Sequence, residues 1–298
     1  MKLKRVVALM LAASMLAAVA GCSKVKKVTG ADFVAACEKI GAEEVDYEDM
    51  NEVEESDLED GVYSVLDSDD IEDLYEDYES SSSSSSMSMY SISAPDVESI
   101  VDADDLEEMT VFAKMDQNFD DISDPEDIEN LDVNGVVGIQ MTLTDSDMVE
   151  DFMGGIADSL DEYGIDVEDL SSDEYYVGKN EAYLRISVSA EDLVAAFLDS
   201  ETYGYLEMMD VDIEDALESL TGDLAVATYI NGENVVVLIG MGINNTTEYL
   251  DEFCGDLGLS SPSKLPSNPE IAESICDTID DTLGSMLSSF AALAAYDY

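Results

Sequence analysis

The sequence predicts an α+β protein of antiparallel sheet and amphipathic helices, arranged as one lobe or as two related lobes and followed by a C-terminal helix. Alternating, strand-like segments occur in pairs joined by short turns, and capped amphipathic helices separate these pairs. Hydrophobic residues make up 46% of the 298 residues, which is enough for a buried core in spite of a formal net charge of -60.

The first 22 residues have the organisation of a bacterial lipoprotein signal. Lys2, Lys4 and Arg5 precede an apolar run from Val6 to Ala20, which ends in Gly21-Cys22. This run is shorter than the roughly 20 residues that span a bilayer as a helix. We therefore interpret residues 1–21 as a cleaved signal peptide. The alternative is an ordinary signal peptide with a chance cysteine.

The motif resembles the lipobox of bacterial lipoproteins, and this resemblance implies a diacylglycerol group on the Cys22 thiol. The protein would then lie on the outer face of the bacterial cytoplasmic membrane, with the membrane as its partner through the Cys22 lipid. Residues 22–28 would form a tether. Its lysines could contact anionic headgroups, or the tether could be fully solvated.

The predicted N-terminal acidic lobe spans 29–135 and begins with a helix from Thr29 to Ile40. Thr29 and Asp32 form a capping box, and Gly41 ends the helix. Residues 43–79 contain nineteen acids, and a poly-serine run follows, so we expect a disordered insert at about 43–94. Strands are expected at 61–66 and 110–115.

The predicted C-terminal α+β lobe spans 136–262 and carries the clearer patterns. Asn231-Gly232 is the strongest hairpin cue in the chain. The expected strands are 136–144, 174–177, 182–188, 224–230 and 235–243, and the expected helices are 147–163, a Ser189-capped helix, 212–220 and 246–257.

After three prolines, an apolar stripe predicts a C-terminal helix over 268–295. It could bind a partner or a membrane. Packing on the protein body is the better interpretation, because its polar face carries neither Lys nor Arg.

Three cysteines remain after Cys22 in a compartment that permits disulfides. Cys37 and Cys254 lie on predicted amphipathic helices with similar surroundings, and we expect a bridge between them, which would leave Cys276 unpaired. The alternative is that all three are small buried hydrophobic residues.

Charge and composition exclude several function classes. The mature chain carries 71 acids against 8 basic residues, so no basic surface for nucleic acid can form. The absence of histidine removes Ser-His-Asp triads and histidine metal sites. We therefore expect no enzyme, catalytic residue, cofactor or dedicated metal site. A hydrolase with paired carboxylates and an acidic surface spacer are the alternatives to a binding protein.

Two motifs partly match known ligand loops. Asp116-Gln117-Asn118-Phe119-Asp120, with Asp124 and Asp127, partly matches the spacing of a calcium loop, but Asp121 stands where glycine is required. We expect at most weak divalent cation binding there. Gly240-Met241-Gly242 lacks the remaining glycine of a dinucleotide loop, and we interpret these glycines as close packing or a bulge.

The order of these elements resembles uncharacterised acidic lipoproteins of Gram-positive bacteria. The resemblance is carried by the lipobox, by Phe33 and Cys37 before Gly41, and by the segment Tyr249–Cys254 before Leu257-Gly258. It implies an α+β envelope protein built from repeated helix-plus-strand units. No catalytic residue is carried over.

Overall fold

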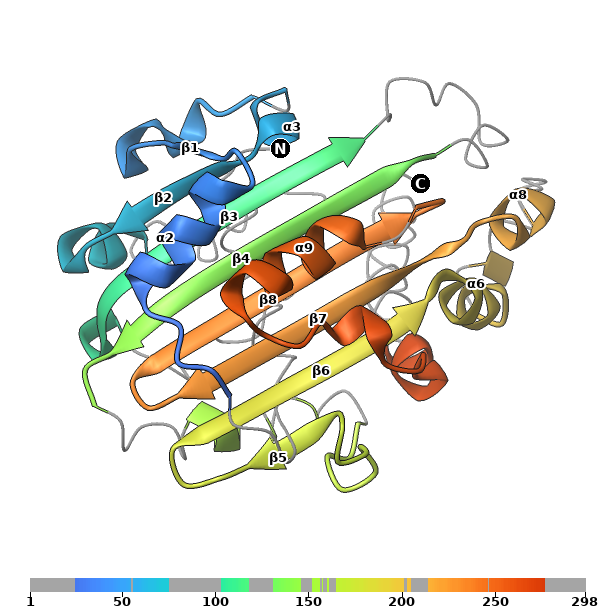
Figure 1. Cartoon of the computed structure of the whole chain (residues 1–298). Helices are drawn as coiled ribbons and strands as arrows, with labels where there is room; N and C mark the ends of the chain where they lie inside the picture. Colours follow the sequence, from blue (N-terminus) through green and yellow to red (C-terminus); the bar gives the residue numbers. More distant parts are fainter. Residues whose placement is uncertain are drawn as a thin grey trace, which may run out of the picture.

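The protein forms one eight-stranded sheet in the order β1-β2-β3-β4-β8-β7-β6-β5 (Figure 1). This computed structural model describes residues 25–74, 103–117, 131–145, 165–200 and 214–276, except Glu55 and Thr246, with short helical pieces between 152 and 160 and at 203–204. The strands are β1 (Glu43–Glu44), β2 (Val62–Leu66), β3 (Leu106–Gln117), β4 (Val133–Leu143), β5 (Tyr175–Val177), β6 (Glu181–Ser189), β7 (Gly222–Asn231) and β8 (Asn234–Ile243). Among the described strands only β1 and β2 pair in parallel, and the predicted α+β class with a largely antiparallel sheet is confirmed.

The two predicted lobes are halves of a single sheet. Strands β1 to β4 form one half and β5 to β8 form the other. Strands β4 and β8 join the halves: they pair along their length, from Val133 opposite Ile243 to Thr142 opposite Asn234. The expected lobe boundary at 135/136 therefore falls inside β4. Both edges of β4 are hydrogen-bonded, to β3 and to β8, and most of its side chains are buried, so the halves share one core.

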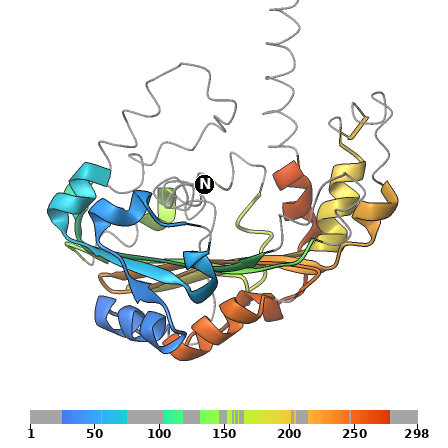
Figure 2. The same cartoon turned by 90° about the horizontal axis from the view of Figure 1, so that it is seen from above.

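Helices cover both faces of the sheet (Figure 2). One face carries α2 (Gly30–Lys39) and α9 (Glu248–Leu257), and the other carries α6 (Ala190–Leu198), α8 (Glu214–Glu218) and the helical residues 269–276. Strands that are buried on both faces lose the simple alternation of apolar and polar residues. The long apolar run of β8 is an example.

Aromatic rings and glycines join α2 and α9 to the sheet. The ring of Phe253 lies edge-on to Phe33 at 5.1 Å and stacks on Phe112 at 4.6 Å. A Cβ at Gly138 would lie 2.9 Å from the Phe33 ring, and one at Gly240 would lie 2.6 Å from Leu250. The glycines of Gly240-Met241-Gly242 therefore lie inside β8, and Gly240 provides the close packing that we expected.

Local signals placed the ends of several elements correctly. Thr29 caps α2 with a capping box, Ser189 caps α6, and Gly258 ends α9 in the left-handed conformation at φ 73°. The Asn231-Gly232 cue correctly marks the β7–β8 hairpin: Asn231 ends β7, and Gly232, at φ 60°, and Glu233 form the turn.

The disordered insert expected at about 43–94 is incorrect for residues 43–74, which are folded. This part contains β1, the 3-10 helix η1 (Tyr47–Asn51), α3 (Asp57–Asp60), β2 and a helical stretch at 68–74. Its few apolar residues are spaced so that they reach the core together; those buried are Tyr47, Met50, Val62, Tyr63, Leu66, Ile71 and Leu74. Acid content alone therefore did not prevent folding. Residues 75–94, with the poly-serine run, lie outside the described residues.

The C-terminal helix expected at 268–295 is described only at 269–276. Ile271, Ala272 and Cys276 are buried there, and the Cys276 thiol lies 3.7 Å from the carbonyl oxygen of Leu193 in α6. These two turns pack on the body, as the charge pattern favoured. Among the described residues, the longest helices are too short and too polar to cross a bilayer.

Candidate functional site

Cys37 and Cys254 lie on α2 and α9, which pack against each other on the same face of the sheet. Neither these two thiols nor Cys276 forms a disulfide, so the expected Cys37–Cys254 bridge is absent. Burial raises the pKa of the Cys37 thiol, and it raises the pKa of Cys254 to about 12. The thiols act as small buried side chains, which was the alternative interpretation.

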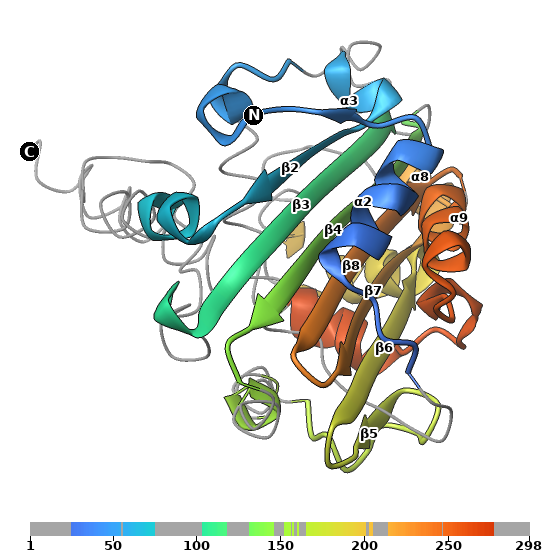
Figure 3. The same cartoon turned by 60° about the vertical axis from the view of Figure 1, so that its left-hand side comes forward.

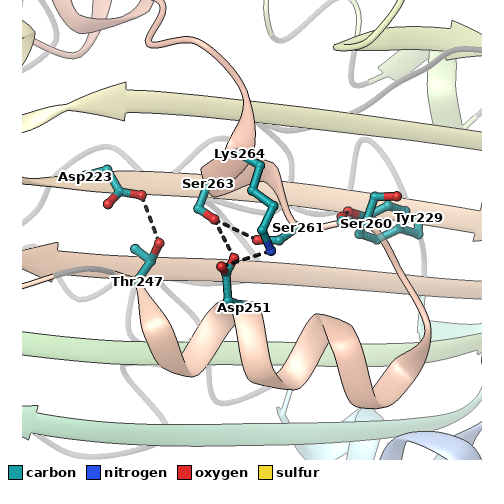
Figure 4. Close-up of polar contacts among 8 residues, drawn as sticks. All are labelled: Asp223, Tyr229, Thr247, Asp251, Ser260, Ser261, Ser263 and Lys264. Atoms are coloured by element: carbon teal, nitrogen blue, oxygen red, sulfur yellow. Dashed lines mark hydrogen bonds and ion pairs between the residues drawn. The ribbon is translucent and has the colours of Figure 1, made fainter.

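A polar cluster surrounds Asp251 where α9 meets the loop that follows it (Figure 4). Ser263 donates a hydrogen bond to Oδ1 of Asp251, and the Ser261 and Ser263 hydroxyls lie 2.9 Å apart. The ammonium of Lys264 lies 2.9 Å from Oδ2 of Asp251. These contacts fasten the 3-10 helix η7 (Pro262–Lys264) against α9, and we call these four residues the Asp251 cluster.

The Asp251 cluster holds an ionised carboxylate. Burial by itself would raise the pKa of Asp251, but hydrogen bonds from Ser261, Ser263 and Lys264, together with the Lys264 charge, lower it overall. The Lys264 side chain is 69% exposed and ion-paired. It is therefore held as a charge partner rather than as a base that could activate Ser263.

A second carboxylate, Asp223, lies at the start of β7 and faces the N-terminus of α9. Its Oδ2 accepts a hydrogen bond of 2.9 Å from the hydroxyl of Thr247, the residue before α9 (Figure 4). Burial raises the pKa of Asp223 more than the two Thr247 hydrogen bonds lower it. Asp223 and Asp251 therefore have carboxyl pKa values shifted in opposite directions within one region.

Arg185 is a buried cation on the same face of the sheet, at β6. It is 9% exposed, and its guanidinium lies 4.4 Å from the centre of the Tyr183 ring. Nη2 donates to the carbonyl of Asp173 at 2.7 Å and to the Tyr183 hydroxyl at 3.2 Å, while Nε has no acceptor within the structure described. Arg185 thus connects its own strand, β6, to the segment that precedes β5.

Tyr229 completes this region. Its hydroxyl donates to the carbonyl of Ser260, in the turn after α9, and its ring lies 5.9 Å from that of Tyr183. Burial raises the pKa of Tyr229 well above its ordinary value, so the phenol stays protonated and remains a donor. Tyr229 and the Asp251 cluster together attach the loop after α9 to the sheet.

Little of this region was predicted from the sequence. No element is expected at the prolines before the C-terminal helix, whereas Pro262 begins η7 and is buried. The one available signal was Arg185, the single arginine of the mature chain, within an alternating strand. Of the candidate cation loop, Asp116 and Gln117 end β3, and the rest lies outside the described residues. In the described parts of the chain, no three Cys, Asp or Glu residues are grouped as metal ligands.

Comparison with known proteins finds no matching family model, no matching curated protein and no matching solved structure.

Proposed function

We propose that the protein is a lipid-anchored bacterial lipoprotein on the outer face of the cytoplasmic membrane, where it acts by binding within the cell envelope. The motif Val19-Ala20-Gly21-Cys22, at the end of a fifteen-residue apolar run, carries this proposal. The similarity to acidic lipoproteins of Gram-positive bacteria supports it. The described part of the fold includes Val25, only three positions after Cys22, so it would lie close to the membrane surface.

Binding is better supported than hydrolysis. A hydrolase with paired carboxylates needs one protonated acid beside one ionised acid. The pKa of Asp223 is raised by burial and that of Asp251 is lowered by its hydrogen bonds, so these two are the carboxylates to consider. Both carboxylates are, however, already engaged: Ser263 and Lys264 contact the two oxygens of Asp251, and Thr247 donates to Asp223. Carboxylates bonded in this way fasten a loop. An extended acidic spacer is also less well supported, because much of the chain folds into one sheet with a shared core.

The Cys22→Ala variant tests the anchor. Without the acceptor thiol no diacylglycerol can be attached, so we expect the variant to leave the membrane fraction and the wild-type N-terminal peptide to carry the lipid mass. Cell fractionation and mass spectrometry measure both. Cys276→Ala is the control and should stay with the membrane. A Cys22→Ala protein that remains membrane-bound, with no lipid on the wild type, contradicts the proposal.

A further inference from the structure

Residues 25–28, which we expected to be part of a free tether, are fastened to one end of the sheet. Val25 and Val28 are 6% and 2% exposed. The Asn231 side-chain amide donates to the carbonyl of Val25, and the Lys26 ammonium donates to the carbonyl of Leu257 at 2.7 Å. Figure 3 shows this segment leaving α2 and running over the sheet toward β6.

The next lysine is also held at this end. The Asn234 amide, oriented with its nitrogen 3.1 Å from the carbonyl of Val28, places its oxygen 3.2 Å from the Lys27 ammonium. Asn231 and Asn234 flank the β7–β8 turn. The start of the folded domain is therefore attached to the tip of this hairpin.

Two hairpin turns lie together at this end. The amide of Gly232 in the β7–β8 turn donates to the carbonyl of Asn180 in the β5–β6 turn at 2.8 Å. We define the anchor end as residues 25–28 together with the turns 177–181 and 231–234.

The surface of the anchor end is less acidic than the rest of the chain and carries an exposed apolar side chain. Val177 is 43% exposed, a large value for an apolar side chain in this structure. The anchor end contains three lysines, Lys26, Lys27 and Lys179, against two carboxylates, Glu181 and Glu233, whereas the whole chain has a net charge of -60.

Several lysines elsewhere are already engaged. Lys39 pairs with Asp256, Lys264 pairs with Asp251, and Lys114 donates to the carbonyls of Ile40 and Asp60. The ammonium of Lys179, by contrast, makes no ion pair with any described residue. It is available to an external anion.

The chain length between the lipid and the fold limits where this end can lie. Two residues, Ser23 and Lys24, lie between Cys22 and Val25, and the three residue steps from Cys22 to Val25 span at most about 10 Å when extended. That reach is close to one Debye length at physiological ionic strength, about 8 Å. Charges at the anchor end would therefore interact with lipid headgroups, while the acidic remainder of the surface would be repelled by them.

We propose that the anchor end docks on the bilayer surface, with Lys27 and Lys179 facing anionic lipid headgroups and Val177 at the interface. This inference rests on the proposed lipid anchor at Cys22. Each lysine near an anionic membrane contributes roughly a fivefold factor in partitioning. Docking would hold the folded domain in one orientation on the bilayer, with the opposite end of the strands directed away from the membrane.

Site-specific fluorescence tests the orientation. The lipidated full-length protein carries an environment-sensitive dye at Val177→Cys or, as a control, at Thr221→Cys, an exposed position about 33 Å away along β7. The native thiols Cys37, Cys254 and Cys276 are buried, so dye attachment favours the introduced cysteine. In phosphatidylglycerol vesicles with nitroxide-labelled headgroups, we expect strong quenching at position 177 and little at 221.

Charge variants test the role of the lysines. In the dye-labelled Val177→Cys protein, Lys179→Glu should weaken quenching severalfold in phosphatidylglycerol vesicles, and Lys264→Gln should leave it unchanged. Equal quenching at 177 and 221, or no effect of Lys179→Glu, overturns the proposal. Mass spectrometry of the same sample separates the two hypotheses: a lipidated protein with equal quenching contradicts docking alone, and a chain without lipid contradicts both.

Discussion

At the residue scale, Asp251 shows why a structural carboxylate cannot be recognised in the sequence of an acid-rich protein. Its neighbours in sequence are also acidic, and only its contacts with Ser261, Ser263 and Lys264 distinguish it. These donors come from the loop after α9, and they hold that loop against the helix. The pKa shift of Asp251 therefore reports a link between two elements.

We predict that the Asp251 cluster makes stability depend on pH. The folded-state pKa of Asp251 is lowered, so its contribution is complete above the ordinary aspartate pKa of about 3.9 and is lost as pH falls through the folded-state value. Asp251→Asn should lower the free energy of unfolding by about 1 kcal/mol at pH 7. Urea unfolding should show this difference shrinking below pH 4. A constant difference contradicts the role of the charge.

Arg185 provides a second test at the residue scale. Arg185→Met keeps much of the side-chain volume but removes the donors to Asp173 and Tyr183, so we expect a loss of about 2 kcal/mol in the free energy of unfolding. Chemical denaturation measures this change. Lys179→Met removes the same charge from an exposed turn and should change stability by less than about 0.5 kcal/mol. Equal effects would show that Arg185 acts only through net charge.

At the element scale, the distance between α9 and the sheet depends on glycine. A Cβ at Gly240 would lie 2.6 Å from Cδ2 and 2.7 Å from Cβ of Leu250, which is fully buried. The helix would have to shift to accept it. The sequence shows the glycine but not the helix that crosses it.

Two glycine-to-alanine variants separate packing from helix propensity. Gly240→Ala should lower the free energy of unfolding by about 2 kcal/mol through overpacking against Leu250. Gly255→Ala lies within α9, where an added Cβ meets nothing within 4 Å, and it should raise the same free energy by about 1 kcal/mol. Thermal or urea unfolding measures both. A destabilised Gly255→Ala would contradict this account of α9.

At the scale of the whole molecule, stability should rise with salt. A formal charge of -60 destabilises the compact state by self-repulsion, and salt screens that repulsion. We expect the melting temperature to increase as sodium chloride is added at low ionic strength. Calorimetry with calcium chloride at equal ionic strength tests whether divalent cations also bind weakly, beyond this screening. A melting temperature equal to that in sodium chloride contradicts specific calcium binding.

Features that depend only on residues close together in the sequence could be predicted without the structure. The Thr29 and Ser189 caps, the Asn231-Gly232 turn and the left-handed Gly258 were all predictable, because each is set within a few residues. The α+β class followed from the same local patterns. The proposed anchor at Cys22 also rests on a local motif.

Features that depend on contacts between segments far apart in the sequence became visible only in the tertiary structure. It joined β4 to β8, so two expected lobes became one sheet, and it folded residues 43–74 by burying sparse apolar side chains together. It also brought Asp251 to Ser263, and Val25 to the β7–β8 turn. Composition and periodicity cannot specify such contacts, because they report how residues alternate along the chain and not which segments meet in space.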